Sequence, residues 1–125
     1  MTTRRMPTEG ELEILNVLWN RGPSTVREVA EALGRSEAYT TVLKLLQIMA
    51  EKRLVTRREA GRSHVYSAAS SRAATQRHLV RDLLRRAFGG SAAQLVLQAL
   101  STARATPEEL NEIRALLDQH GGGRR

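Results

Sequence analysis

The sequence predicts a mainly α protein with a small β-hairpin, in which an N-terminal winged helix-turn-helix precedes a C-terminal α-helical dimerisation region. An amphipathic segment from Ala38 to about Arg53 passes directly into a short basic strand-turn-strand that ends near Ala68. Aromatic residues make up only 3% of the 125 residues, so the core must consist mainly of Leu, Val, Ile and Ala. That composition favours helices.

The first helix is predicted from its start and stop signals. Thr8 is an N-cap residue with Glu11 three positions later, a capping-box pattern that satisfies two otherwise unpaired amides. Gly22-Pro23 ends the helix. Its buried stripe is expected to consist of Leu12, Leu15, Leu18 and Trp19.

The second helix shows the same pattern. It begins at Ser24 or Thr25, with Glu28 three positions after the threonine, and Gly34 ends it where a left-handed residue is often needed. A turn through residues 35–37 leads into the third helix. The buried side chains are expected to be Val26, Val29, Ala30 and Leu33.

The third helix has two distinct faces at about 100° per residue. Its core face carries Ala38, Val42, Leu45, Leu46 and Met49, and its opposite face carries Thr40, Leu43, Lys44, Gln47, Ile48 and Glu51. The second face mixes hydroxyl, amide and ammonium groups with aliphatic ones, as a helix in the major groove requires. The alternative is that Leu43 and Ile48 pack on another part of the protein. Phosphate would repel Glu51, so DNA contacts are expected from Tyr39 to Gln47.

The hairpin is predicted from β-prone residues on both sides of a glycine. Leu54, Val55 and Thr56 begin one strand, Ala60-Gly61-Arg62-Ser63 forms the turn, and residues 64–67 form the second strand. A lone hairpin is marginally stable in water, so it must dock on the preceding helix. The side chains available for docking are Val55, Val65 and Tyr66.

Three further helices are predicted after Ser70. The fourth, about Arg72 to Phe88, is followed by Gly89-Gly90. The sixth opens at Thr106 with Pro107 at its first position and Glu109 completing a capping box, and it runs to His120. The fifth, about Ser91 to Thr102, is so apolar that it should be buried nearly all round.

The last three helices are too small a unit to enclose the fifth, but pairing with a second copy of the chain would do so. The alternative is packing onto the N-terminal domain. We therefore expect a winged-helix domain over 8–69, a dimerisation region over 70–120 and flexible tails at 1–7 and 121–125. The expected dimerisation residues are Leu83, Leu84, Phe88, Leu95, Val96, Leu97, Leu100, Leu110, Ile113, Leu116 and Leu117.

The net charge of +7 is concentrated around the hairpin. From Lys52 to Arg86, ten basic residues against two acidic ones give +8, so the rest of the chain sums to −1. Phosphate binding needs such a localised positive field. The groove is expected to be contacted by Tyr39, Thr40, Thr41, Lys44 and Gln47, and the flanking phosphates by Arg57, Arg58, Arg62 and His64. Imidazole changes charge near neutral pH, which would make the His64 contact pH-sensitive.

Several other functions are disfavoured. The chain has no cysteine, which excludes disulfides, thiolate metal sites and cysteine nucleophiles. Its three histidines lack metal-ligand spacing, and it contains no nucleophile elbow or phosphate loop, so we expect neither a metal, a cofactor nor an enzyme activity. No apolar run approaches membrane-spanning length, so we expect a cytoplasmic protein without membrane insertion.

The residues assembled above resemble the penicillinase-repressor (BlaI/MecI) family of bacterial transcriptional regulators over nearly the whole chain. The resemblance is carried by Glu11-Leu12-Glu13, Val17-Leu18-Trp19, residues 25–29, Tyr39-Thr40-Thr41-Val42, Leu45-Leu46, Gly61-Arg62, Val65-Tyr66-Ser67, residues 108–112 and Leu116-Leu117. It implies a homodimer that represses transcription by binding double-stranded DNA at a two-fold symmetric operator. In the best-known members, a sensor-linked protease triggered by β-lactam relieves repression by cleavage in the C-terminal region.

The sequence departs from this family pattern at three places. Ile48 stands where the recognition helix usually has Arg, and Arg53 stands where Gly commonly follows that helix. The cleavable Asn-Phe bond would fall near Gln98-Ala99, which does not match, so cleavage by a β-lactam sensor is disfavoured. Copper-responsive relatives use C-terminal cysteines, which this chain lacks.

Two functions of other classes stay open at this point. The chain could be a protein-interaction module in which the fifth helix recruits a partner. It could also be a small-molecule-responsive regulator with a ligand among the C-terminal helices, although apolar residues there more often form core than pocket.

Overall fold

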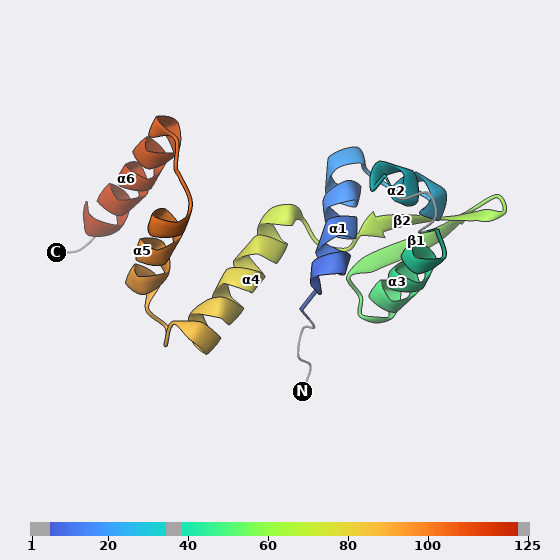
Figure 1. The fold of residues 1–125 in the computed structure, drawn as a ribbon, viewed down its shortest axis with the longest axis horizontal. Coiled ribbons are helices and arrows are strands. Elements are labelled where there is room, and N and C mark those ends of the chain that lie inside the picture. The colour runs from blue at the N-terminus through green and yellow to red at the C-terminus, as the bar shows by residue number, and fades with distance from the viewer. Residues whose placement is uncertain (1–5, 35–38, 123–125) are drawn as a thin grey trace. The chain divides into compact units, whose positions relative to one another are not determined.

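The computed structural model describes residues 6–34 and 39–122. Within these residues the order is α1 (Glu9–Arg21), α2 (Val26–Ala32), α3 (Tyr39–Glu51), β1 (Val55–Ala60), β2 (Ser63–Ala68), α4 (Arg72–Ala87), α5 (Ala92–Thr102) and α6 (Pro107–Gly122) (Figure 1). This confirms the predicted fold class, a winged helix-turn-helix followed by C-terminal helices. The predicted turn at 35–37, the start of the third helix at Ala38 and residues 1–5 of the expected N-terminal tail lie outside the described residues.

The three predicted capping boxes are all present. The Thr8 N–H donates to Glu11 Oε1 at 2.9 Å, and the Glu11 N–H donates to Thr8 Oγ1 at 3.2 Å. The other two boxes are Thr25–Glu28 and Thr106–Glu109. Local sequence therefore fixes the starts of α1, α2 and α6, because each box pairs amides that have no partner within the helix.

The core lies between α1, α2, α3 and the hairpin. Most of the residues predicted to face the core of the first three helices are buried in it. Ile14 is also buried but was not predicted, and Leu12, Trp19, Leu33 and Leu45 are only partly buried at the edge of the core. Its buried apolar residues are Ile14, Leu15, Leu18, Val26, Val29, Ala30, Val42, Leu46, Met49, Val55 and Tyr66.

The hairpin is antiparallel, and Gly61-Arg62 is its two-residue loop. Gly61 has φ 64°, a conformation that glycine adopts at little steric cost. Ser24 tethers the hairpin to the turn after α1, since its N–H donates to the Tyr66 carbonyl at 3.0 Å and the Tyr66 N–H donates back at 2.8 Å. Val55 and Tyr66, two of the three predicted docking residues, are buried, and this side of the hairpin is held on the helices.

The chain divides into two compact units, residues 1–80 and 81–125, so α4 starts in the first and ends in the second. The first turn of α4 is tied to α1 within the first unit. Trp19 Nε1 donates to the Ser70 carbonyl at 2.9 Å, Arg72 Nη2 donates to Asn20 Oδ1 at 2.6 Å, and the Arg72 guanidinium lies 5.4 Å from the Trp19 ring centroid. The beginning of α4 is therefore part of the winged-helix unit.

The fifth helix is not buried within the single chain, and the expectation that a second copy buries it stays a prediction. No residue of α5 is buried, and Val96, Leu97 and Leu100 are 40%, 67% and 41% exposed. The C-terminal unit is small, and α6 and the end of α4 supply too few side chains to surround α5.

The sixth helix is two residues longer than expected. Gly121 keeps a helical backbone instead of the left-handed conformation that often ends a helix at glycine, so α6 continues to Gly122. The remainder of the expected tail, 123–125, lies outside the described residues. No helix in the described ranges is both long and apolar enough to span a bilayer.

Candidate nucleic-acid interface

The exposed face of α3 carries the predicted groove-contacting side chains. Val42, Leu46 and Met49 are buried, so the helix is fixed on the core by one face. The predicted contacts Tyr39, Thr40, Thr41, Lys44 and Gln47 are all exposed. Hydroxyl, ammonium and amide groups therefore project together from the N-terminal two-thirds of the helix, where base edges could be reached.

The two aliphatic residues of this face behave differently. Leu43 is partly buried and packs against the core, as the structural alternative required. Ile48 is 36% exposed and is the one that presents an apolar group beside the polar ones. Of the pair, only Ile48 is free to touch a thymine methyl or sugar.

Strand register divides the four residues that were expected to hold phosphates. Side chains directly opposite each other across the ladder share a face of the hairpin. Arg57 is opposite Tyr66 and therefore lies on the face that docks on the helices, whereas Arg58 is opposite Val65 on the other face. His64 shares the Arg57 face, and Arg62 lies in the loop. The structure thus does not bring these four side chains into one cluster.

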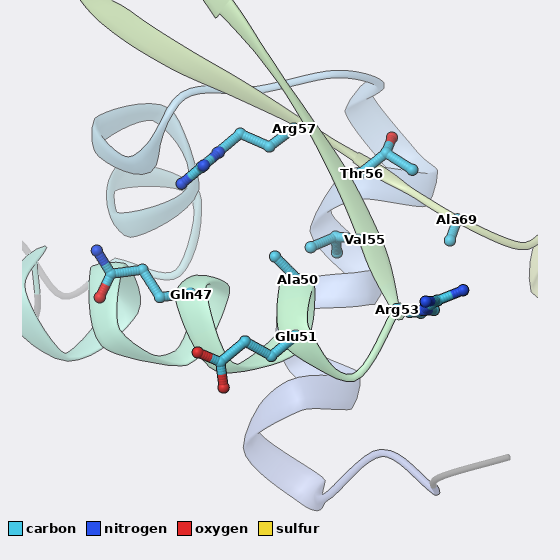
Figure 2. A pocket seen from close by; sticks show the side chains of 8 residues that line it. All are labelled: Gln47, Ala50, Glu51, Arg53, Val55, Thr56, Arg57 and Ala69. Carbon is cyan, nitrogen blue, oxygen red and sulfur yellow. The ribbon is translucent and has the colours of Figure 1, made fainter. Parts of the chain in front are cut away.

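Gln47 of α3 and Arg57 of β1 lie on the same groove. They line an open groove of about 790 Å³ between the C-terminal half of α3 and β1 (Figure 2). Arg53 lies at the other end of the groove, and Glu51 on its α3 side (Figure 2). Two arginines against one glutamate give the groove a net positive lining, which suits a phosphate backbone passing between helix and wing.

Arg53 forms the turn after α3 without glycine. Its φ is 66°, and no other non-glycine residue in the described part of the chain has a positive φ. The Leu54 N–H donates to the Met49 carbonyl at 2.9 Å, and the Arg53 N–H donates to the Ala50 carbonyl at 3.1 Å, which is the Schellman pattern. Arg53 stands where the family commonly has Gly, and its backbone adopts the left-handed conformation that Gly would otherwise supply.

Lys52, next to this turn, makes a long-range contact that the sequence did not reveal. Its Nζ donates to both carboxylate oxygens of Glu11 at 2.9 Å, and Glu11 is 2% exposed. The end of α3 is thereby attached to the start of α1. Capping logic identified Glu11, but nothing local indicated its second partner.

Arg27 is a second residue that the sequence reasoning missed. It is exposed on α2, and its guanidinium carbon lies 5.8 Å from the ring centroid of Tyr39, the first residue of α3. At the wing, His64 Nε2 lies 4.0 Å from Glu59 Oε2, so an acidic neighbour accompanies the predicted phosphate contact.

In the described ranges, no group of three His, Asp or Glu side chains is arranged to hold a metal ion. The polar side chains of α3 and the wing offer hydrogen-bond donors and positive charge instead. This arrangement suits recognition of a polyanion.

The chain is similar in sequence to known proteins. The family model described as penicillinase repressor matches residues 7–119. The transcriptional regulator BlaI of Mycobacterium tuberculosis is 39% identical over 93 residues, which are 70% of this chain and 67% of that relative. The penicillinase repressor of Bacillus licheniformis is 24% identical over 115 residues, 90% of each chain.

A solved structure of similar outline is MepR, a transcription regulator of the Staphylococcus aureus multidrug efflux pump MepA. It matches 93% of this chain and 78% of its own at 20% identity, with a TM-score of 0.48.

Proposed function

Because this chain belongs to the penicillinase-repressor family of DNA-binding transcriptional repressors, we propose that it acts as a homodimer on a two-fold symmetric operator. Residues 8–69 form the DNA-binding part and residues 70–120 the dimerisation region in this proposal. Its bacterial relatives lead us to place it in the cytoplasm, where the operator is.

The observation that carries the homodimer is the unburied apolar surface of the C-terminal helices. Neither α4 nor α5 has a buried residue. The expected dimerisation residues fall into two sets. Leu84, Phe88, Leu95, Leu110 and Ile113 are partly buried, and Leu83, Val96, Leu97, Leu100, Leu116 and Leu117 are exposed. The exposed set is available to a second copy, whose burial of it would be favourable by about 25 cal/mol per Å².

Operator reading is assigned to α3. Its exposed side chains Thr40, Lys44 and Gln47 meet base edges, while Arg57, Arg58, Arg62 and His64 contact phosphates. The hairpin register supports phosphate contacts on more than one side of the wing, since Arg57 and Arg58 point to opposite faces. A wing held in this way can lie along a backbone strand with one arginine toward α3 and another away from it.

Footprinting on the DNA upstream of the chain's own gene tests this function. We expect a protected segment with two-fold symmetry. If each protomer neutralises about four or five phosphates, log K should fall with log salt at a slope of about −7 to −9. Equal affinity for this segment and for random DNA, or an affinity that hardly changes with salt, would contradict the proposal.

A further inference from the structure

The pair formed by Arg27 and Tyr39 lies where the first helix of the helix-turn-helix meets the start of the second. The Arg27 guanidinium carbon is 5.8 Å from the Tyr39 ring centroid. Arg27, Ala30, Glu31 and Tyr39 line a shallow concavity of about 180 Å³. Both paired side chains are exposed, so the concavity opens to solvent beside the first turn of α3.

The position of Arg27 follows from how α2 is held. Val26, Val29 and Ala30 are buried and fix one face of α2 on the core, which leaves Arg27 on the outer face. Glu28 is occupied by the capping box with Thr25 and by Arg21 at 3.8 Å. Arg27 instead lies over an aromatic ring on the next helix, a contact that restricts its otherwise flexible side chain.

In a helix-turn-helix, the first helix crosses the DNA backbone while the N-terminal residues of the second reach the bases. We propose that Arg27 is a phosphate contact and that Tyr39 positions it. This inference rests on the proposed function and adds a contact on α2 to those of α3 and the wing. A guanidinium held beside a ring still has N–H groups free to donate, and these match a phosphate in a bidentate way.

The alternative interpretation is that Arg27 forms an ordinary exposed ion pair with Glu31, one turn further along α2. Glu31 lines the same concavity. The two readings differ in their salt dependence, because only a phosphate contact releases counterions from the DNA when the complex forms.

The test is the salt dependence of operator binding by the full-length chain, measured by fluorescence anisotropy with a labelled operator duplex. Arg27→Ala and Arg27→Gln each remove one phosphate contact per protomer. The slope of log K against log salt should therefore become shallower by about 1.8 for a dimer. Over a fourfold rise in salt, each variant should then lose about tenfold less affinity than the wild type. Preference for the operator over a base-substituted duplex should stay unchanged, because phosphate contacts carry no sequence information.

Arg104→Ala is the matched control, since it removes an exposed arginine from the other unit and should leave the slope at the wild-type value. Positioning by Tyr39 is tested with a double-mutant cycle. Tyr39→Phe keeps the ring and should preserve the effect of Arg27→Ala, whereas Tyr39→Leu should reduce that effect.

A wild-type slope in both Arg27 variants overturns the inference, as does a lost preference between the two duplexes, which would indicate a base contact. Equal effects of Arg27→Ala in the Tyr39→Phe and Tyr39→Leu backgrounds would remove the positioning role. These results differ from failure of the proposed function, in which the unmodified chain itself would show no preference for the operator.

Discussion

At the scale of single residues, Arg53 shows how the chain makes a turn that usually calls for glycine. A left-handed backbone is unfavourable for a residue with a Cβ by about 1 to 2 kcal/mol. Here the two Schellman hydrogen bonds and the burial of neighbouring Val55 hold it in place. Arg53 also lines the groove between α3 and β1, so its side chain stays near the proposed path of the DNA.

We predict that Arg53→Gly raises the free energy of unfolding by about 0.5 to 1 kcal/mol, because the relief of the left-handed strain exceeds the extra entropy that glycine has when unfolded. Urea denaturation measures the change. Arg53→Ala removes the same charge but keeps a Cβ at φ 66° and should give no gain. Equal stability of the Gly and Ala variants would show that the conformation carries no strain.

Lys44 is the residue on which base reading is most directly testable. It is exposed on α3, one turn after Thr40. If it reads a base edge, Lys44→Ala should weaken operator binding by about 1 to 3 kcal/mol and relax selectivity at that base pair. Glu51→Gln, a change at the end of the same helix, should leave affinity unchanged or higher because phosphate repels a carboxylate. Unchanged affinity in Lys44→Ala would remove this residue from the interface.

At the scale of elements, the Glu11–Lys52 ion pair links the start of α1 to the end of α3. The carboxylate is 2% exposed and the lysine side chain 17%, so both charges are largely removed from water. The Glu11 carboxylate also accepts the Thr8 N–H at 2.9 Å. One side chain therefore caps α1 and holds the C-terminal end of α3 against it.

We predict that Lys52→Met lowers the free energy of unfolding by about 2 to 4 kcal/mol, since it leaves a buried carboxylate without its cation; the lower end of this range reflects the partial exposure of Lys52. Adding Glu11→Gln to that variant should recover part of the loss. The control is Arg21→Met, which breaks the exposed Arg21–Glu28 pair at 3.8 Å and should change stability by less than about 1 kcal/mol. Similar losses of stability in Lys52→Met and Arg21→Met would mean that burial of Glu11 does not increase the cost of breaking its ion pair.

The elements also show what the sequence could and could not predict. Capping boxes, the Gly61 turn and the faces of α3 follow from residues three or four positions apart, and all were predicted. The contacts of Lys52 with Glu11, of Arg27 with Tyr39 and of Ser24 with Tyr66 join distant segments, and no local period indicates them. The split of Arg57 and Arg58 between faces required the register of the hairpin.

At the scale of the whole molecule, the two units differ in how completely they are packed. The first has a closed core made by three helices and a hairpin. In the part of the C-terminal helices that the structure describes, no residue is buried, although α5 is mainly apolar. We therefore expect the first unit to fold by itself, and we expect a partner to bury the exposed apolar surface of the C-terminal helices.

We predict that Leu97→Asp converts the proposed dimer to a monomer, as measured by analytical ultracentrifugation. Leu97 is 67% exposed in the single chain, so the charge should do little to the fold of the protomer but should oppose burial against a second copy. Operator affinity should fall by two or more orders of magnitude, because the two half-sites would then be bound by separate molecules.

Gln98→Asp provides the control for charge alone. Gln98 is exposed on α5, about 100° around the helix from Leu97 and away from Val96 and Leu100, so this variant should stay dimeric and bind the operator like the wild type. A Leu97→Asp chain that remains dimeric would exclude this face of α5 and move the interface toward Leu116 and Leu117 on α6. Dissociation of both variants would show that the helix tolerates no added negative charge, and the assignment of the interface to one face of α5 would fail.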